Sequence, residues 1–520
     1  MEILTGSVGQ SDRIFNDFTA MLNDIIGADN TPVEMRSQAL QLGLVFACSI
    51  SQLSPGAFFL QRNLYPAIAN FIRSPDTGSF TLHGTLFLAI LANYHKSDAA
   101  KLNPYLKRIK ECEDEVLMSK LCASVNESIE IAVRAYGNSC TTDASAVKSA
   151  ASSITSAISL LRPDRLITRV TGQPSAAPEA EKPQPVEAAV ALLPLYEFLH
   201  GNGNFISILL KPMQTEYQKD ATQRSPLPVS LVNLASHLFT HGSTYNSPRT
   251  GSYVNLLLDI FLILAENNQT MDVFSSTSAS GVSLCRQRMP RLPPPNPGRP
   301  FVCEILDSCI LLFRHNLNGR IPTQSYLKCV WICHRVVWYL QDRRVRIEYA
   351  WKELWSSIFS TLSFVSSKLD SLVTTGGIEQ LVSDMLLFLA VAVSCSEVYL
   401  PSPQASYEMI YELVRNIGTL EKMQTLLNTL AYQKRSRNLA LRYVIQVSSF
   451  YGENIAAKTP SSASGTLQVI VQELELNGLH VPNEHNFGDP EPQVRSEEVL
   501  DFARYACGDG LELGMEMLGV

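Results

Sequence analysis

Apolar residues recur at every third or fourth position through most of this chain, which is the period of an amphipathic helix rather than of a strand. In the segment 11–27 they form one stripe, with Ser11 predicted as the N-cap and Gly27 as the residue that follows the last turn. The next helix opens at Thr31, with a proline and a glutamate at capping-box spacing behind it. Sustained period-2 runs bounded by turn residues are nearly absent. We therefore predict an all-α fold.

The predicted helices come in pairs that repeat roughly every 40–45 residues, a spacing shared by HEAT and armadillo units. Short connections between helices of about 15–20 residues favour a stacked solenoid, in which each pair buries its apolar face on its neighbours. The sequence shows no residue-level repeat consensus, so the prediction rests on this pattern. The predicted architecture is an armadillo/HEAT-like α-solenoid of stacked helix pairs in two blocks.

Changes in composition divide the chain into four parts. Residues 1–165 form a first helical block. Residues 189–480 form a second, the C-terminal armadillo-like block, with a long basic, proline-rich connector at 270–300. Between the blocks, residues 166–188 are rich in Pro, Ala, Glu and Gln, and we expect this linker to be disordered because it cannot bury enough apolar surface. Residues 481–520 form an acidic tail.

The end of the chain differs in charge from the rest. From Glu473 to the last residue there are eleven acidic residues and two arginines, whereas the whole chain has a net charge of only −7. The remaining body is therefore mildly basic. In the tail we expect one short helix, near 495–507, that docks loosely on the body or not at all.

Composition restricts the class of protein. Hydrophobic residues make up 46% and charged residues 18% of the chain, as expected for a large buried core, and the negative net charge argues against a nucleic-acid-binding surface. The eleven cysteines lack paired spacings, which favours a reducing, cytosolic setting, and the N-terminus shows no secretory signal. The most apolar runs, 253–265 and 385–395, are shorter than the ~20 residues that span a bilayer. We expect any membrane association to be peripheral.

The sequence lacks the motifs of common enzyme classes. It contains no phosphate-binding P-loop, Rossmann fingerprint, HExxH pair, nucleophile elbow or kinase signature. The nearest metal-like group comprises Cys303, Cys309, Cys329, Cys333 and His334, but these residues lie in apolar helical segments rather than on the turns typical of zinc sites. We interpret them as packing residues.

A second pair, His237 and His241, lies one helical turn apart near the end of a predicted helix. This spacing suits either two metal ligands or two structural histidines that form hydrogen bonds with neighbouring groups. We favour the second interpretation. We therefore expect no catalytic residue, no metal, no cofactor and no small-molecule substrate.

Basic and aromatic residues cluster between the 270–300 connector and residue 411. The arginines are either solvated helix ends or a surface that meets an anionic membrane or an acidic partner. The tryptophans, all four of which fall between Trp331 and Trp355, belong either to the core or to an interface. The candidate contact residues are Arg286, Arg288, Arg291, Arg299, Arg343, Arg344, Arg346, Trp351, Trp355, Tyr407 and Tyr411.

Three motifs in order resemble a known family. They are the Arg-Pro that ends the connector at Arg299, the segment RVRIEYAWKELW that begins at Arg344, and LPSPQASYEMIYELVR from Leu400 to Arg415. Together they are similar to the C-terminal region of the armadillo-like helical domain-containing protein 3 family. The resemblance is strong over roughly 270–420 and architectural elsewhere.

The resemblance implies a function that the composition and residue spacing of the chain do not themselves indicate. It implies a cytosolic helical-repeat scaffold, associated peripherally with the Golgi, that supports Golgi organisation and secretion. The implied protein partners are phosphatidylinositol 4-kinase beta and the large Golgi Arf guanine-nucleotide exchange factor, with an anionic membrane surface as a further contact. Nucleic acid is not among the expected partners.

Three other classes of function remain open from the sequence. An integral, multi-pass membrane protein would use the helices near 253–265 and 381–396. An unrecognised enzyme would need converging carboxylates or histidines. A cargo-binding armadillo module of nuclear transport would need a row of Trp and Asn residues, and the clustering of the tryptophans argues against such a row.

Overall fold

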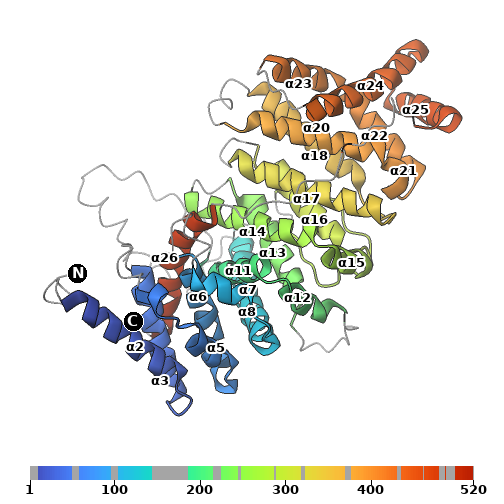
Figure 1. The fold of residues 1–520 in the computed structure, drawn as a ribbon. Coiled ribbons are helices and arrows are strands. Elements are labelled where there is room, and N and C mark those ends of the chain that lie inside the picture. The colour runs from blue at the N-terminus through green and yellow to red at the C-terminus, as the bar shows by residue number, and fades with distance from the viewer. Residues whose placement is uncertain are drawn as a thin grey trace.

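The computed structural model describes most of the chain as a stack of helices (Figure 1). Within the described part the only other regular feature is an isolated antiparallel bridge between Ser278 and Pro300, so the predicted all-α solenoid is confirmed. The described residues are 10–49, 58–94, 103–142, 186–214, 224–243, 247–285, 288–317, 322–368, 376–429, 435–460, 462–479, 487 and 498–518.

The long helices form two parallel layers, and each helix packs against the next one of its own layer and against a partner in the other. The first layer contains α2 (Ser11–Gly27), α5 (Tyr65–Arg73), α8 (Glu115–Thr142), α13 (Leu227–His241), α16 (Val302–His315), α18 (Trp351–Ser367), α22 (Pro403–Arg415) and α25 (Ala463–Asn477). The second layer contains α3 (Val33–Ser49), α6 (Thr81–Ala92), α11 (Leu192–Gly201), α14 (Pro248–Glu266), α17 (Thr323–Asp342), α20 (Ile378–Ser394) and α24 (Arg435–Lys458).

Shorter elements connect the layers or cover their edges. They are η2 (Pro75–Phe80), α7 (Pro104–Lys110), η5 (Glu187–Ala191), α12 (Phe205–Gln214), α15 (Asn268–Ser276), α21 (Ser396–Tyr399) and α23 (Ile417–Thr429). One further helix, α26 (Glu498–Leu518), lies on the second layer. The stacking continues without interruption from α8 to α13 and from α6 to α11. The division into two separately folding blocks therefore stays a prediction.

Some helices of the second layer are apolar all round, as expected where neighbours cover a helix on several sides. In α6, for example, every residue from His83 to Ala92 is buried. Gly84 allows this close packing, since a Cβ atom there would come within 2.9 Å of the Ile72 side chain on α5. The two runs weighed above as membrane spans lie in α14 and α20 of this layer, where their side chains are buried against other helices. No helix in the described part of the chain is long and apolar enough to cross a membrane.

Helix α26 corrects the prediction for the end of the chain. It has 21 residues rather than about a dozen, and it packs against α3, α6, η5 and α14. Figure 1 shows it among the N-terminal helices, far from α25, which precedes it in the sequence. The acidic character of the tail suggested loose docking. Its Phe502 and Ala506 are nevertheless buried, and its acidic Asp509 pairs with a buried arginine, Arg249.

Several predictions lie partly or wholly outside the described residues. These are the linker up to residue 185, the candidate contact residue Arg286 and the tail at 481–486, 488–497 and 519–520. The predicted start of the second block, Ala189, falls inside η5, which begins at Glu187. At the N-terminus, α2 begins at Ser11 itself, and Gln10 occupies the N-cap position without a side-chain hydrogen bond. The predicted Ser11 cap is therefore wrong.

Several buried histidines make the stability of this fold depend on pH, and two of them, His83 and His334, show how. His83 on α6 and His334 on α17 are 2% and 5% exposed, and burial lowers the pKa of His83 from 6.5 to about 4. Burial, reinforced by the charge of Arg335, lowers the pKa of His334 to about 3. Since both folded pKa values lie below the unfolded value, acid protonates the unfolded state first. The stabilisation is complete above pH 6.5 and is lost as the pH falls towards 4.

We expect each of these histidines to remove about 1.4 kcal/mol from the free energy of unfolding at about pH 5.5, one unit below the unfolded pKa. Urea unfolding at about pH 7.5 and 5.5 measures this loss. His83→Gln removes the group that titrates. On acidification, the free energy of unfolding of this variant should therefore fall by about 1.4 kcal/mol less than that of the wild type. His200→Gln, which changes an exposed histidine, is the control and should behave like the wild type. An equal pH dependence of wild type and His83→Gln would contradict the prediction.

Candidate functional site

An open groove of about 370 Å³ lies where the segment after α17, the short helix α21 and the start of α22 meet the end of α25. We call it the α22 groove. It brings together two of the residues selected from the sequence, Arg346 and Tyr407. The full lining consists of Arg346, Ser396, Glu397, Leu400, Ser402, Pro403, Ser406, Tyr407, Leu474 and Leu479.

The way in which α17 ends places Arg346 in this groove. Arg344 has a left-handed backbone with φ of 53° and follows the C-cap residue Arg343. The Val345 N–H donates to the carbonyl of Leu340 at 2.9 Å, and the Arg344 N–H donates to the carbonyl of Gln341 at 3.1 Å. These two bonds form a Schellman motif, with arginine at the position that glycine usually takes. The motif ends the helix and turns the chain towards α21.

Arg346 is held in place by backbone carbonyl groups of α21. Its Nη2 donates to the carbonyl of Glu397 at 2.7 Å, and its Nε donates to the carbonyl of Val398 at 3.4 Å. The side chain remains exposed. A cation at the last carbonyl groups of a helix is favourable because it satisfies acceptors that have no partner within the helix. The guanidinium group is therefore fixed in orientation while it stays accessible from the groove.

The apolar wall of the groove comes from α22 and α25. Pro403 occupies the first turn of α22, where a proline costs no hydrogen bond, and Tyr407 follows one turn later. Tyr407 is half-buried, and Leu474 and Leu479 face it from the end of α25 and the residues after it. The Ser396 hydroxyl oxygen is buried beside this wall and has no hydrogen-bond partner. The sequence could not identify Leu474 of α25 as a residue of this groove, because only the fold brings α25 next to α22.

The tryptophans of the second motif are core residues, so their prediction as contact residues is wrong. Trp351 is 2% exposed and Trp355 is completely buried. Their rings stack at 5.7 Å, and Trp351 meets Tyr399 edge-on at 5.0 Å. Because Leu400 follows Tyr399 directly and lines the groove, the tryptophans form the packed base on which the groove-lining turn rests. Their apolar stripe was the signal for this interpretation.

Arg299 is also internal, contrary to the prediction. Its side chain is 8% exposed, and it pairs with Glu304 at 2.6 Å and with Asp307 at 2.7 Å, both on α16. Tyr349 donates a further hydrogen bond to Asp307 at 3.0 Å. Both carboxylates are almost fully buried. Arg299 therefore neutralises two acids inside the solenoid and is not part of an exposed surface.

The remaining candidate residues are spread over the molecule. Arg343 and Arg344 are exposed at the end of α17, and Arg291 is exposed on the connector. Arg288 is half-buried, and its Nη1 donates to the carbonyl of Thr240 at 3.0 Å. Tyr411 is half-buried, one turn beyond Tyr407, and packs against the core. Of the ten candidates that the structure describes, only Arg346 and Tyr407 line the groove.

The cysteines weighed as a metal site are packed inside the solenoid. Cys309, Cys329 and Cys333 are completely buried, and the Cys329 thiol donates to the carbonyl of Cys309 at 3.6 Å. Burial raises the pKa of the Cys309 and Cys333 thiols well above their usual range, so these groups stay protonated. Among the residues that the structure describes, His334 does not join them in a group of converging ligand atoms.

The chemistry of the groove suits binding. Its walls are apolar with a tyrosine and several hydroxyl groups, and it carries one arginine and one glutamate. Tyr and Arg are the residues that most often contribute large shares of binding energy at protein interfaces. A pocket of this size, lined by both apolar and polar residues, fits an apolar side chain or two of an extended segment together with its hydrogen-bonding groups.

Comparison with known proteins links this groove to a family. Residues 299–475 match the family model described as Armadillo-like helical domain-containing protein 3, C-terminal. This range contains every residue of the groove except Leu479. No solved structure matches the chain.

Relatives in distant organisms resemble most of the chain. The protein named Armadillo-like helical domain-containing protein 3 is 25% identical in Danio rerio, over 71% of this chain and 56% of that relative. In Homo sapiens the protein of that name is 24% identical over the same shares. A protein named UPF0588 membrane protein in Schizosaccharomyces pombe is 24% identical over 62% of this chain and 51% of its own length. The match thus covers little more than half of each relative. The resemblance inferred from the sequence is confirmed: residues 299–475 are similar to the C-terminal region of the armadillo-like helical domain-containing protein 3 family.

Proposed function

We propose that this chain is a non-catalytic helical scaffold whose α22 groove binds a segment of a partner protein. One observation carries the proposal. Residues from two of the family motifs, Arg346 and the segment from Leu400 to Tyr407, line a single accessible groove. The second motif, which contains Arg346, also supplies the buried tryptophans beneath the groove.

The family resemblance supports a specific setting for this scaffold. The proposed partners are phosphatidylinositol 4-kinase beta or the large Golgi Arf guanine-nucleotide exchange factor, recruited to the cytoplasmic face of the Golgi. There the chain supports Golgi organisation and secretion. Peripheral attachment through exposed basic residues such as Arg291 fits this setting, since each basic residue near an anionic leaflet contributes about 1 kcal/mol.

The name of the fission-yeast relative favours a second candidate, an integral membrane protein. The two candidates differ in how the chain is extracted from membranes. A peripheral scaffold is released from the membrane pellet by high salt or alkaline carbonate, whereas an integral protein stays in the pellet. Carbonate-resistant pelleting would overturn the scaffold proposal.

Substitution in the groove tests the binding site. We expect Arg346→Glu and Tyr407→Ala each to weaken partner binding about 30-fold, the effect of losing an interface residue worth about 2 kcal/mol. The measurement is affinity purification of the full chain with quantification of the lipid kinase and the exchange factor, followed by titration of whichever is retained.

Arg343→Glu is the matched control, because it changes the same charge on an exposed arginine outside the groove. Arg344 is unsuitable for this purpose, since its left-handed backbone ends α17. Equal recovery of the partners by wild type, groove variants and control would exclude the α22 groove as their binding site.

A further inference from the structure

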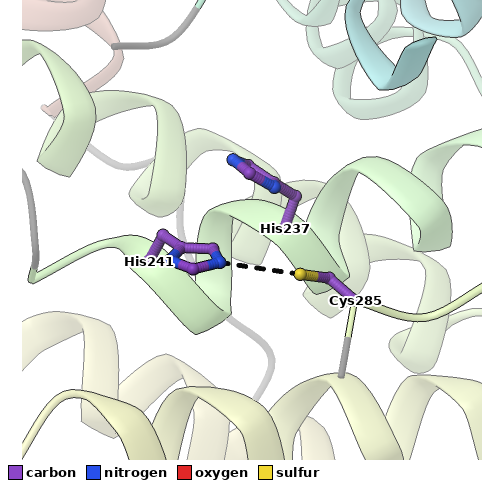
Figure 2. Close-up of side chains that lie close together, drawn as sticks. All are labelled: His237, His241 and Cys285. Carbon is purple, nitrogen blue, oxygen red and sulfur yellow. Dashed lines mark hydrogen bonds between the residues drawn. The ribbon is translucent and has the colours of Figure 1, made fainter. Parts of the chain in front are cut away.

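Three potential metal ligands meet beside α13, and one of them comes from a distant part of the sequence. His237 and His241 lie one turn apart near the end of α13, and Cys285 belongs to the connector after α15. Figure 2 shows the Cys285 side chain directed at the ring of His241, with His237 on the preceding turn of the same helix. The ligand atoms of the three residues all lie within 4.8 Å of one another.

The connector is fixed along α13 by hydrogen bonds that leave the thiol of Cys285 facing the helix. The Ser283 N–H donates to Asn233 Oδ1 at 2.7 Å, and the Cys285 N–H donates to Ser236 Oγ at 2.7 Å. The Thr240 hydroxyl donates to the carbonyl of Cys285 at 3.3 Å. Asn233, Ser236 and Thr240 follow one another at helical spacing, so one polar stripe of α13 sets the position of this segment. The position of Cys285 is therefore built into the fold.

The histidines are positioned as well. The His237 ring is buried and stacks on Tyr136 of α8, with centroids 4.1 Å apart. The rings of His237 and His241 have centroids 4.8 Å apart, as two residues four apart on one helix allow. His241 and Cys285 are only half-buried, so solvent ions have access to this end of the cluster.

From this geometry we infer that His237, His241 and Cys285 bind a divalent transition-metal ion, with zinc as the first choice. Two imidazole nitrogens and one thiolate sulfur are the donor set that zinc prefers. In a tetrahedral site with Zn–S of about 2.3 Å and Zn–N of about 2.0 Å, sulfur and nitrogen ligands lie about 3.5 Å apart. The Cys285 sulfur lies 3.6 Å from His241 Nε2, so this edge already has the required length.

Small side-chain movements complete the site. The ligand nitrogens of a tetrahedral site lie about 3.3 Å apart, within the reach of rotation about the broad terminal torsion of a histidine. Arg288 is close by, but its Nη1 is bonded to the carbonyl groups of Thr240 and His315. Deprotonation of Cys285 on binding supplies one negative charge, which offsets part of the positive charge of the ion and of this arginine. Three protein ligands leave one position for water or for a ligand from another molecule.

Bound in this way, the ion would fasten the connector to α13. The inference is independent of the proposed scaffold function, because it concerns the middle of the solenoid and not the α22 groove.

Titration of the purified full chain with Co²⁺ tests the inference. Cobalt replaces zinc in tetrahedral sites and reports a thiolate ligand through a charge-transfer band, besides the visible bands of tetrahedral geometry. We expect one equivalent of Co²⁺ to bind with both signals, and one equivalent of Zn²⁺ to abolish them. Cys285→Ser should lose the charge-transfer band, and His241→Gln should weaken binding at least about ten-fold, since even outer-shell substitutions act on that scale.

Two control variants test whether the ion binds to this cluster or to other cysteines and histidines of the chain. Cys122→Ser changes a half-buried cysteine of α8, and His200→Gln changes an exposed histidine, so both should bind Co²⁺ like the wild type. Circular dichroism of each variant confirms folding, and the half-buried positions of His241 and Cys285 favour it. Absence of stoichiometric tetrahedral binding would show that the cluster is only a thiol–imidazole hydrogen bond. Persistence of the charge-transfer band in Cys285→Ser would assign the metal to other residues. Either result would overturn the inference.

Discussion

Arg299→Ala is expected to reduce the free energy of unfolding by about 3–5 kcal/mol, because removal of one partner leaves buried charges uncompensated. Glu304 and Asp307 are 3% and 4% exposed, and each pairs directly with the guanidinium group. Without Arg299 the two carboxylates on neighbouring turns of α16 would repel each other in a region that water barely reaches. Urea unfolding monitored by circular dichroism measures the change.

A triple variant separates the loss of charge balance from the loss of packing. Arg299→Met combined with Glu304→Gln and Asp307→Asn replaces all three charges, and neutral replacement of a buried ionic group is often close to neutral for stability. We expect it to recover most of the stability that Arg299→Ala loses. If Arg299→Ala proved as stable as the wild type, the arginine would not be the internal counter-ion described here. Arg291→Ala, at an exposed connector arginine, provides the baseline.

Asp509→Ala is expected to release α26 from the second layer while the rest of the solenoid stays folded. Asp509 accepts hydrogen bonds from Arg249 Nε at 3.0 Å and from the Tyr253 hydroxyl, and its ion pair with Arg249 Nη2 measures 2.8 Å. Both partners belong to α14, and Phe502 packs edge-on against Tyr253 at 4.8 Å. Loss of one member of such a buried pair costs about 3–5 kcal/mol, which is large for the docking of a single helix.

Hydrogen exchange of the full chain measures this release. Amides of α26 should lose protection in Asp509→Ala, whereas amides of α16 and α17 should keep theirs. Asp342→Ala is the control, because Asp342 is 63% exposed and, among the described residues, its ion pair is with the neighbouring Arg343. Unchanged protection of α26 in Asp509→Ala would show that its apolar contacts alone hold it in place.

Local features of the fold could be predicted from the sequence because they depend on neighbours a few residues apart. The apolar stripe of residues 11–27 predicts α2. The capping pattern from Thr31 to Glu34 predicts the next helix, which begins at Val33. Proline at the first turn of α22 gives its start at Pro403. The cap at Ser11 failed because Gln10 already has helical backbone angles.

The candidate groove could be predicted only in part. The motifs that contain Arg346 and Tyr407 identified segments that line the groove, but the three family motifs also include Trp351, Trp355 and Arg299, which are buried. An apolar or basic residue in a helical pattern has the same signature whether it faces a partner protein or the next helix. The distinction depends on which helix covers it, and that helix is distant in sequence.

The sequence by itself determined the helices, the solenoid class and the family, since hydrophobic period and short motifs act over one or two turns. The tertiary structure alone decided which charged groups pair and which residues form the proposed metal site. Asp509 reaches Arg249 across 260 residues, and Cys285 reaches His241 across 44. Such pairs form because stacking of the layers buries the groups together, and burial without a partner costs far more than the pairing gains. No short sequence pattern shows which of these groups will pair.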